Sequence, residues 1–187
     1  MRDTRDLILD ASLEVFTEKG YTSATTLDIS KKAGVSEMTL FRHFKTKDNL
    51  FILSIKKAMG TSIDKDLKPH LELSLSDFIS ELLDEKLTII SSQIDVIKML
   101  IRETLSHKLP EDLAFPKIIS NQVIYKISLY VKHHHLDMDP ISFGQMIVGL
   151  LLRYAIMEER PVYHQLGYDE KMKYLKSYLD ILNTQGE

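Results

Sequence analysis

The stretch from residue 25 to residue 44 constrains the fold most, because it encodes two short helices joined by a tight turn. Thr25 is a good helix N-cap, and Asp28 follows three residues later in the arrangement of a capping box. Gly34 ends the first helix, since glycine adopts the left-handed conformation of a helix stop without a Cβ penalty. Ser36 caps the second helix. A helix-turn-helix unit is therefore predicted here.

Small and apolar side chains around the turn predict how these two helices pack. Ala33 is small where the helices cross, while Val35 and Leu40 fix the angle of the second helix. Its N-terminal outward face is then free to enter the major groove of DNA. An αα-hairpin in any helical protein has the same features, so the turn alone does not specify a function.

Charge is distributed unevenly along the chain. The whole sequence has a net charge of −3, but residues 31–57 contain seven basic and two acidic side chains, a net charge of +5. Residues 61–187 contain 14 basic and 19 acidic side chains, a net charge of −5. A basic patch on an acidic body is typical of a DNA-binding protein. A solvated helical face has the same composition, so the charge is a weak signal by itself.

The rest of the chain also has the periodicity of helices. Apolar residues recur at helical spacing, and neither a period-two strand pattern nor an internal repeat is present. The segments with this spacing are 8–20, 75–91, 95–107, 118–134, 140–159 and 169–182. The predicted fold is all-α, with a three-helix DNA-binding domain over residues 1–50 and a larger helical domain over residues 51–187. The boundary is expected inside a shared helix.

Composition excludes several classes of protein. The chain has no cysteine, so disulfides and thiolate metal sites are ruled out. Its first residues are charged rather than apolar like a signal peptide, and apolar runs such as 147–152 are too short to span a bilayer. A cytoplasmic protein without a membrane partner is expected.

The N-terminal residues resemble the DNA-binding signature of the tetracycline-repressor (TetR) family of bacterial and archaeal regulators. The matching positions occur in order within about the first 50 residues. They are Phe16 to Tyr21, Thr25, Ile29, Ala33 to Ser36, Thr39 to Phe41, Phe44, Lys47 and Leu50. The remaining chain resembles the family only in length and helical character.

The resemblance implies a homodimer that binds double-stranded DNA at a palindromic operator. The two N-terminal domains would reach successive major grooves, roughly 34–36 Å apart or at a related spacing. It also implies a larger C-terminal domain that holds the dimer together and often binds a small molecule.

The resemblance also implies which side chains meet DNA. This predicted set is Thr25, Glu37, Met38, Thr39, Phe41, Arg42, His43 and Lys47. Arg42 is expected to read a guanine by a bidentate contact. Thr39 would touch a thymine methyl group or a phosphate. Glu37 either accepts from a cytosine amino group or serves only as a first-turn acid favoured by the helix dipole.

Two further residues are expected at the DNA backbone. Thr25 would hold a phosphate through its backbone N–H and hydroxyl at a helix N-terminus, and Lys47 would do so with its ammonium. Phe41 replaces the usual tyrosine of the family, so a hydroxyl that commonly touches phosphate is missing. His43 also replaces a frequent tyrosine, and its imidazole N–H could supply that contact. Met38 stands where a small residue is common.

Other candidate sites are weaker. His133, His134 and His135 suggest a metal site, but adjacent residues on a helix point in different directions. A favourable interaction with the C-terminal end of the helix dipole explains them better. No nucleophile triad, Gly-rich phosphate loop or HExxH motif is present. We therefore expect no metal, no cofactor and no enzymatic activity.

The C-terminal segments contain aromatic and methionine side chains that suit either a ligand pocket or a plain core. They are Phe78, Met99, Tyr125, Tyr130, Met146 and Tyr154. A pocket of this kind would bind a small apolar or aromatic molecule. The helix over 140–159 is apolar around most of its circumference, so it must be covered on both sides. With segment 169–182 it is predicted to form half of a four-helix dimer interface.

The sequence thus predicts a DNA-binding transcriptional regulator, a repressor released by a ligand in its C-terminal domain. An activator or a ligand-independent regulator of the same fold is the alternative. A helical scaffold protein that contains an αα-hairpin is the rival from another class, and an enzyme is the least favoured. The residues that bind the ligand are not predicted.

Overall fold

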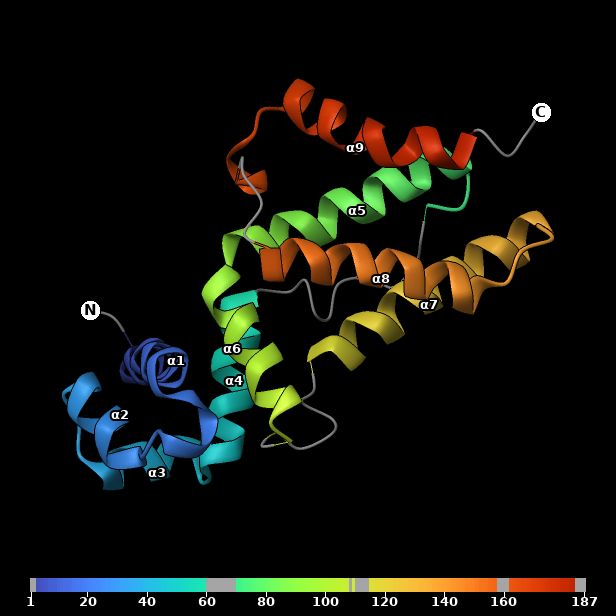
Figure 1. Cartoon of the computed structure of the whole chain (residues 1–187). Coiled ribbons are helices and arrows are strands. Elements are labelled where there is room, and N and C mark those ends of the chain that lie inside the picture. Colours follow the sequence, from blue (N-terminus) through green and yellow to red (C-terminus); the bar gives the residue numbers. More distant parts are fainter. Residues whose placement is uncertain (1–2, 60–69, 108, 110–114, 158–161, 184–187) are drawn as a thin grey trace. The chain divides into compact units, whose positions relative to one another are not determined.

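The computed structural model describes residues 3–59, 70–107, 109, 115–157 and 162–183 (Figure 1). Every regular element in these ranges is a helix, as predicted. The elements are α1 (Thr4–Ser23), α2 (Thr26–Ala33), α3 (Glu37–Phe44), α4 (Lys47–Met59), α5 (Leu75–Ser92), α6 (Ile94–Leu105), α7 (Phe115–His134), α8 (Pro140–Met157), the 3-10 helix η3 (Tyr163–Gln165) and α9 (Tyr168–Asn183).

The chain forms two compact units. Unit 1 consists of Met1–Lys65 and Asp95–Phe115, and unit 2 consists of Asp66–Ile94 and Pro116–Glu187. Unit 1 therefore contains α6 from Asp95 onward as well as α1 to α4. The predicted boundary at residue 50 falls inside α4, and the sequence did not indicate that α6 packs within the N-terminal unit. The division into two functional domains stays a prediction.

The core of unit 1 is built on α1, which packs against α2 and α4. Each helix contributes fully buried apolar side chains. These include Ile8 and Phe16 of α1, Ile29 of α2, Leu40 and Phe44 of α3, and Leu50 and Phe51 of α4. Burying one such side chain contributes about 1.5–3 kcal/mol. These buried side chains thus fix the positions of α2 and α3 within unit 1.

Helix α1 is interrupted at Gly20, where the sequence predicted its end. Gly20 has φ 77° and ψ 165°, and helical residues resume through Ser23. The expected helix stop is therefore a one-residue break. Tyr21, directly after it, packs its ring edge-on against Phe51 with centroids 4.9 Å apart. This contact packs the end of α1 against α4.

Unit 2 is organised around α5, which packs against α8, α9 and η3. Phe78 of α5 stacks on Tyr130 of α7 with ring centroids 4.3 Å apart. Tyr130 also donates from its hydroxyl to the carbonyl of Leu73 at 2.7 Å. Of the six candidate pocket residues, Phe78, Met99, Tyr130 and Tyr154 are buried, whereas Tyr125 and Met146 are exposed. Met99 belongs to unit 1, so the six residues do not form one core.

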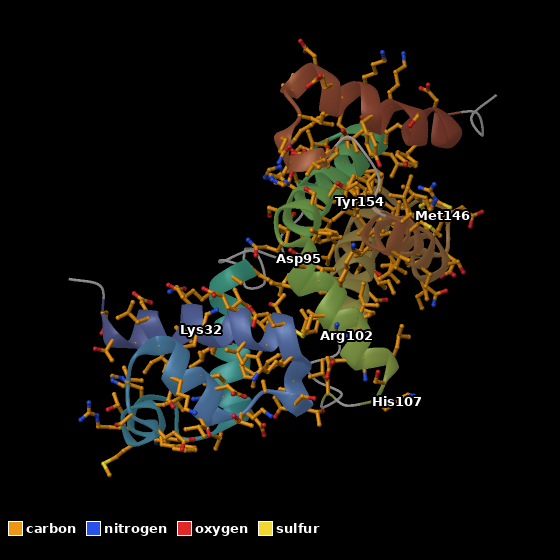
Figure 2. The ribbon with its side chains drawn as sticks, turned by 60° about the vertical axis from the view of Figure 1, so that its left-hand side comes forward. Lys32, Asp95, Arg102, His107, Met146 and Tyr154 are labelled. Atoms are coloured by element: carbon orange, nitrogen blue, oxygen red, sulfur yellow. The ribbon has the colours of Figure 1, made fainter. Side chains whose placement is uncertain are left out.

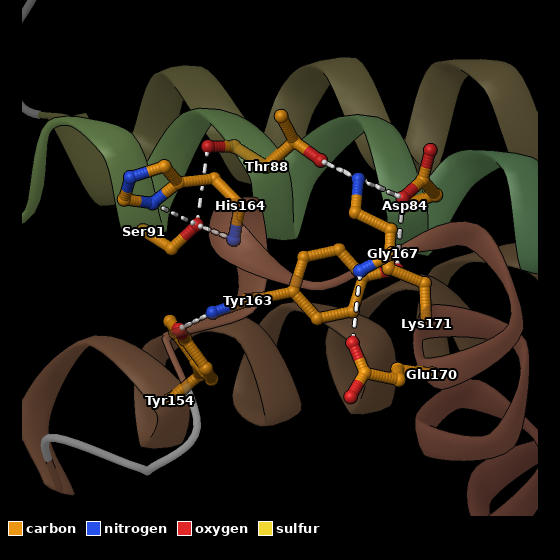
Figure 3. A network of polar contacts seen from close by, with 9 residues as sticks. All are labelled: Asp84, Thr88, Ser91, Tyr154, Tyr163, His164, Gly167, Glu170 and Lys171. Atoms are coloured by element: carbon orange, nitrogen blue, oxygen red, sulfur yellow. Dashed lines mark hydrogen bonds and ion pairs between the residues drawn. The ribbon is translucent and has the colours of Figure 1, made fainter.

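A polar network joins the segment before α9 to α5 (Figure 3). Asp84 Oδ1 accepts from the hydroxyl of Tyr163 at 2.8 Å and from Nζ of Lys171 at 3.0 Å. The backbone N–H of Tyr163 donates to the hydroxyl of Tyr154 at 3.0 Å. Burial, reinforced by Asp84, raises the pKa of Tyr163 far above its usual range. The network therefore fixes η3 against α5.

Helix α8 is long and apolar enough to cross a membrane, by length and composition only. This differs from the expectation based on short apolar runs, because polar residues are few along its 18 residues. Its buried side chains include Ile147, Leu151 and Tyr154, which pack within unit 2. A core helix of a folded protein passes the same test.

The three consecutive histidines lie at the end of α7, which finishes at His134. The ring of His134 lies 4.3 Å from that of Tyr130, and its Nε2 is 2.7 Å from the carbonyl oxygen of Leu71. Over the described ranges no group of three potential ligand side chains is placed to hold a metal ion. These contacts within unit 2 explain the position of the His134 side chain.

Candidate nucleic-acid interface

The turn between α2 and α3 has the geometry that its residues predict. Thr25 and Asp28 form a capping box, in which Thr25 Oγ1 accepts from the N–H of Asp28 at 3.0 Å. Gly34 is left-handed, with φ 68° and ψ 31°. The N–H of Val35 then donates to the carbonyl of Ser30 at 3.0 Å and closes the turn. The predicted caps and helix stop are confirmed.

Two contacts fix the start of α3. The hydroxyl of Ser36 accepts from the N–H of Thr39 at 3.1 Å, which confirms the predicted N-cap. Glu37 Oε1 accepts from the hydroxyl of Thr26 at 2.6 Å. This side chain therefore bridges α2 and α3. Glu37 lies in the first turn of α3, as one of its two predicted roles requires, and its role at DNA stays a prediction. The bridge to Thr26 was not predicted, because the partners are 11 residues apart.

The inner and outer faces of α3 carry different side chains. Leu40 and Phe44 are fully buried on the inner face. On the outer face, Met38 is 83% exposed and Phe41 is 43% exposed. Arg42 is exposed, and within the described ranges it makes no hydrogen bond or ion pair. This face offers an apolar surface beside one available guanidinium group.

Thr39 and His43 flank this face and are half-buried. The hydroxyl of Thr39 lies 3.0 Å from that of Ser36, so it takes part in the cap. The ring of His43 lies 6.1 Å from that of Phe44. Both side chains reach the surface less fully than Met38 and Arg42.

Thr25 lies at the start of α2 but uses both of its donors within the protein. Its N–H and its hydroxyl donate to Asp28 Oδ2, at 3.3 Å and 2.8 Å. Asp28 also forms an ion pair with Lys19 at 2.9 Å. A phosphate contact from either donor of Thr25 would have to replace a bond to this carboxylate.

Lys47 opens α4 and is half-buried. Its Nζ donates to the carbonyl of Thr22 at 3.4 Å and lies 4.6 Å from the centroid of the Tyr21 ring. Burial lowers the pKa of Lys47, and the nearby carboxylates of Asp48 and Glu103 oppose that change. The ammonium is therefore held against the protein in this structure.

The positive charge of this region is smaller than the sequence window suggests. Lys32 pairs with Glu14 at 2.7 Å, and Lys57 pairs with Asp10 at 2.7 Å (Lys32 is labelled in Figure 2). Both acids lie on α1, outside the window of residues 31–57. The exposed cations Lys45 and Arg42 remain near the end of α3. Lys45, which has φ 62°, was not among the predicted DNA-binding residues.

Comparison with known proteins relates this geometry to a family. Residues 8–53 match the model of bacterial regulatory proteins of the tetR family. The uncharacterized HTH-type transcriptional regulator YvkB of Bacillus subtilis is 37% identical over 105 residues, which are 55% of this chain and 53% of that protein. The match thus spans about half the length of this relative.

Solved structures share the whole fold at lower identity. A transcriptional regulator of the TerR/AcrR family from Aquifex aeolicus has a TM-score of 0.68 and 18% identity, over 96% of this chain and 99% of the other. The regulator FadR of Bacillus subtilis, in complex with stearoyl-CoA, has a TM-score of 0.61 and 19% identity, over 91% and 96%. The helix-turn-helix lies within the matched stretch, and over residues 8–53 the chain is similar to bacterial regulatory proteins of the tetR family.

Proposed function

We propose that this chain is a sequence-specific transcriptional regulator that binds operator DNA through α3. The observation that carries the proposal is the two-sided character of this helix. Leu40 and Phe44 anchor it from beneath, while Met38, Phe41 and Arg42 face outward. An anchored helix with a free outer face can enter the major groove without disturbing the core.

Different residues of this surface would make different kinds of contact with DNA. Arg42 has the fork of donors that matches a guanine edge, so it would carry base recognition. Met38 and Phe41 would make apolar contacts with thymine methyl groups or sugars. Lys45 would meet a phosphate, and Lys47 would do so only when its ammonium leaves the Thr22 carbonyl. Phosphate contacts supply much of the affinity but no sequence information. Glu37 would act indirectly, by holding the start of α3 against α2.

We propose that the regulator acts as a homodimer joined through α8 and α9. Apolar side chains stay exposed on one half of the circumference of α8: Ile141, Met146, Ile156 and Met157. Gly149 lies in the same half, and a Cβ added there would meet no atom within 4 Å. The exposed polar side chains of Ser142, Gln145 and Arg153 lie in the same half, so the surface mixes apolar and polar groups as protein interfaces do. A second copy of this helix would cover it.

We further propose that a small molecule in the C-terminal unit releases the DNA, so that the protein represses until the ligand arrives. The fold shared with FadR, which was solved with stearoyl-CoA, supports a ligand with a large apolar part. Such a regulator works in the cytoplasm, where its DNA is. No enzymatic activity is part of this proposal.

The proposal is tested by selecting DNA with the full-length protein. Purified protein is incubated with a pool of random duplexes, and the bound sequences are determined after several rounds. We expect a palindromic motif whose half-sites lie about one helical turn apart, or at a related spacing. Light scattering should show a dimer at the same concentration. A pool without any enriched motif would count against the function, and a monomer would count against the dimer.

A further inference from the structure

Unit 1 contains a buried carboxylate that its core does not require. Glu103 of α6 is only 4% exposed. Its Oε1 lies 3.5 Å from Nε of Arg102 (labelled in Figure 2), and its Oε2 has no hydrogen-bond partner among the described residues. A buried carboxylate is normally fully hydrogen-bonded or paired. This position therefore suggests a role beyond packing.

The carboxylate of Glu103 lies at the break in α1. A Cβ added to Gly20 would lie 2.5 Å from Glu103 Oε1 and 3.1 Å from its Cδ. Gly20 also has a positive φ of 77°, which disfavours a side chain there. Glu103 thus occupies space that only a glycine leaves free. The break in α1 and the position of this carboxylate depend on each other.

The two residues after Gly20 hold the ammonium of Lys47. Nζ of Lys47 lies 4.6 Å from the centroid of the Tyr21 ring and 3.4 Å from the carbonyl oxygen of Thr22. The Tyr21 ring is fixed in turn by Phe51, 4.9 Å away, and by a hydrogen bond to Asp48. The short segment from Gly20 to Thr22 therefore meets Glu103 on one side and Lys47 on another.

Two nearby carboxylates favour the same position of the Lys47 ammonium as these contacts do. Burial lowers the pKa of Lys47, and Asp48 and, to a smaller extent, Glu103 attract its ammonium and oppose that change. Asp48 is exposed, so water screens its interaction with Lys47. Glu103 is buried, and a buried charge is screened much less. The attraction of Glu103 should therefore fall less with added salt than that of Asp48.

We propose that Glu103 is a positioning residue that holds Lys47 on the Gly20–Thr22 segment and thereby competes with DNA phosphate for its ammonium. The inference rests on the proposed DNA-binding function and adds a restraint on it. Removing the negative charge frees Lys47 to reach the backbone of bound DNA. One added phosphate contact steepens the salt dependence of binding by about 0.9 in log–log slope. At about 0.15 M salt that slope corresponds to roughly fivefold tighter binding per protomer.

The test is a double-mutant cycle on DNA binding. Full-length wild type, Glu103→Gln, Lys47→Gln and the double variant are titrated by fluorescence anisotropy at several salt concentrations. The probes are the selected operator duplex and a mixed-sequence duplex of equal length. We expect Glu103→Gln to tighten binding and steepen the slope when Lys47 is present. In the Lys47→Gln background it should change affinity less than twofold. Glu72→Gln, an exposed site in unit 2, controls for net charge.

Unfolding measurements check the steric part of the proposal. Gly20→Ala should lower the unfolding midpoint, and adding Glu103→Ala should recover part of that loss because the clash is removed. Glu103→Gln should keep the wild-type circular dichroism spectrum, so its effect on binding is not a loss of fold. Equal destabilisation by Gly20→Ala with and without Glu103 would overturn the steric contact.

The binding outcomes separate this inference from the function on which it rests. If the wild type binds neither duplex, the DNA-binding function fails, and the restraint on Lys47 fails with it. If the wild type binds its operator and Arg42→Ala weakens it, the function stands. Glu103→Gln without effect, or with equal effect in both Lys47 backgrounds, would then overturn the inference alone.

Discussion

The two units fix their short elements by different means. In unit 1, α2 and α3 are stopped and started by residues within a few positions, such as Thr25 with Asp28 and Ser36 with Thr39. In unit 2, η3 is held by residues far away in sequence, since Tyr163 bonds to Asp84, 79 positions earlier. A cap formed by residues close in sequence can persist when residues elsewhere in the chain are replaced. An element held by residues far away in sequence keeps its position only if those residues are also retained.

This difference agrees with where the chain resembles its relatives. The family model matches residues 8–53, within unit 1. Whole-chain structural similarity reaches unit 2 at below 20% identity, as in the Aquifex aeolicus regulator. We infer that α2 and α3 are specified by caps within a short stretch of sequence, and that the C-terminal helices are free to diverge.

The largest effect is expected from the buried anchor of α3. Leu40→Ala removes a fully buried side chain and should lower the free energy of unfolding by about 2–5 kcal/mol. Phe41→Ala is the control, because the neighbouring side chain is 43% exposed and its loss should cost far less. Urea denaturation followed by circular dichroism measures both. Equal losses would show that α3 is not anchored on one side.

The next effect tests the long-range network of unit 2. Asp84→Ala leaves the buried hydroxyl of Tyr163 and the ammonium of Lys171 without their shared acceptor. It should cost about 1–3 kcal/mol of unfolding free energy. Asp180→Ala, at an exposed position of α9, is the matched control and should change it by less than about 0.5 kcal/mol. If the two variants unfold alike, the network does not hold η3.

A smaller effect is expected from the local cap of α2. Thr25→Ala removes the acceptor for the N–H of Asp28 and should cost about 0.5–2 kcal/mol. Thr22→Ala is an exposed control three residues earlier. Hydrogen exchange should show faster opening of α2 in Thr25→Ala alone. Protection unchanged in both variants would mean that the capping box is not what stops α2 from fraying.

The smallest effect is a dependence on pH. Lys19 and Thr25 lower the pKa of Asp28 to about 2, below its value of 3.8 in an unfolded chain. The carboxylate therefore contributes its stability above about pH 4, and this contribution is lost as the pH falls toward 2. Asp28→Asn should lose less stability than the wild type over this interval, with Lys19→Ala between them. Parallel thermal-denaturation profiles would contradict the ion pair.

The parts of the fold that could be predicted are those that depend on near neighbours. The caps at Thr25 and Ser36 and the left-handed Gly34 follow from residue type and spacing alone. Helical periodicity also located the five helices after residue 70 to within a few positions. Gly20 shows the limit, because its break in α1 was visible but the contact of Tyr21 with Phe51 was not.

Contacts between helices could not be predicted in the same way. The net charge of +5 over residues 31–57 includes Lys32, yet this side chain pairs with Glu14 of α1, which lies outside that range. Glu37 lies in the first turn of α3, as predicted, but its hydrogen bond from Thr26 of α2 was not predicted. Which side chains meet between two helices depends on the angle at which the helices cross. A single sequence holds no direct signal for those angles.

The most direct measurement of the central claim is the specificity of Arg42→Ala. Affinities for the selected operator and for a mixed-sequence duplex of equal length are measured at one fixed salt concentration. Because Arg42 is expected to read a base, the variant should lose about 1–3 kcal/mol of discrimination between the two duplexes. Lys132→Ala, which removes one exposed charge in unit 2, should keep the wild-type ratio. An unchanged ratio in Arg42→Ala would contradict sequence reading by α3.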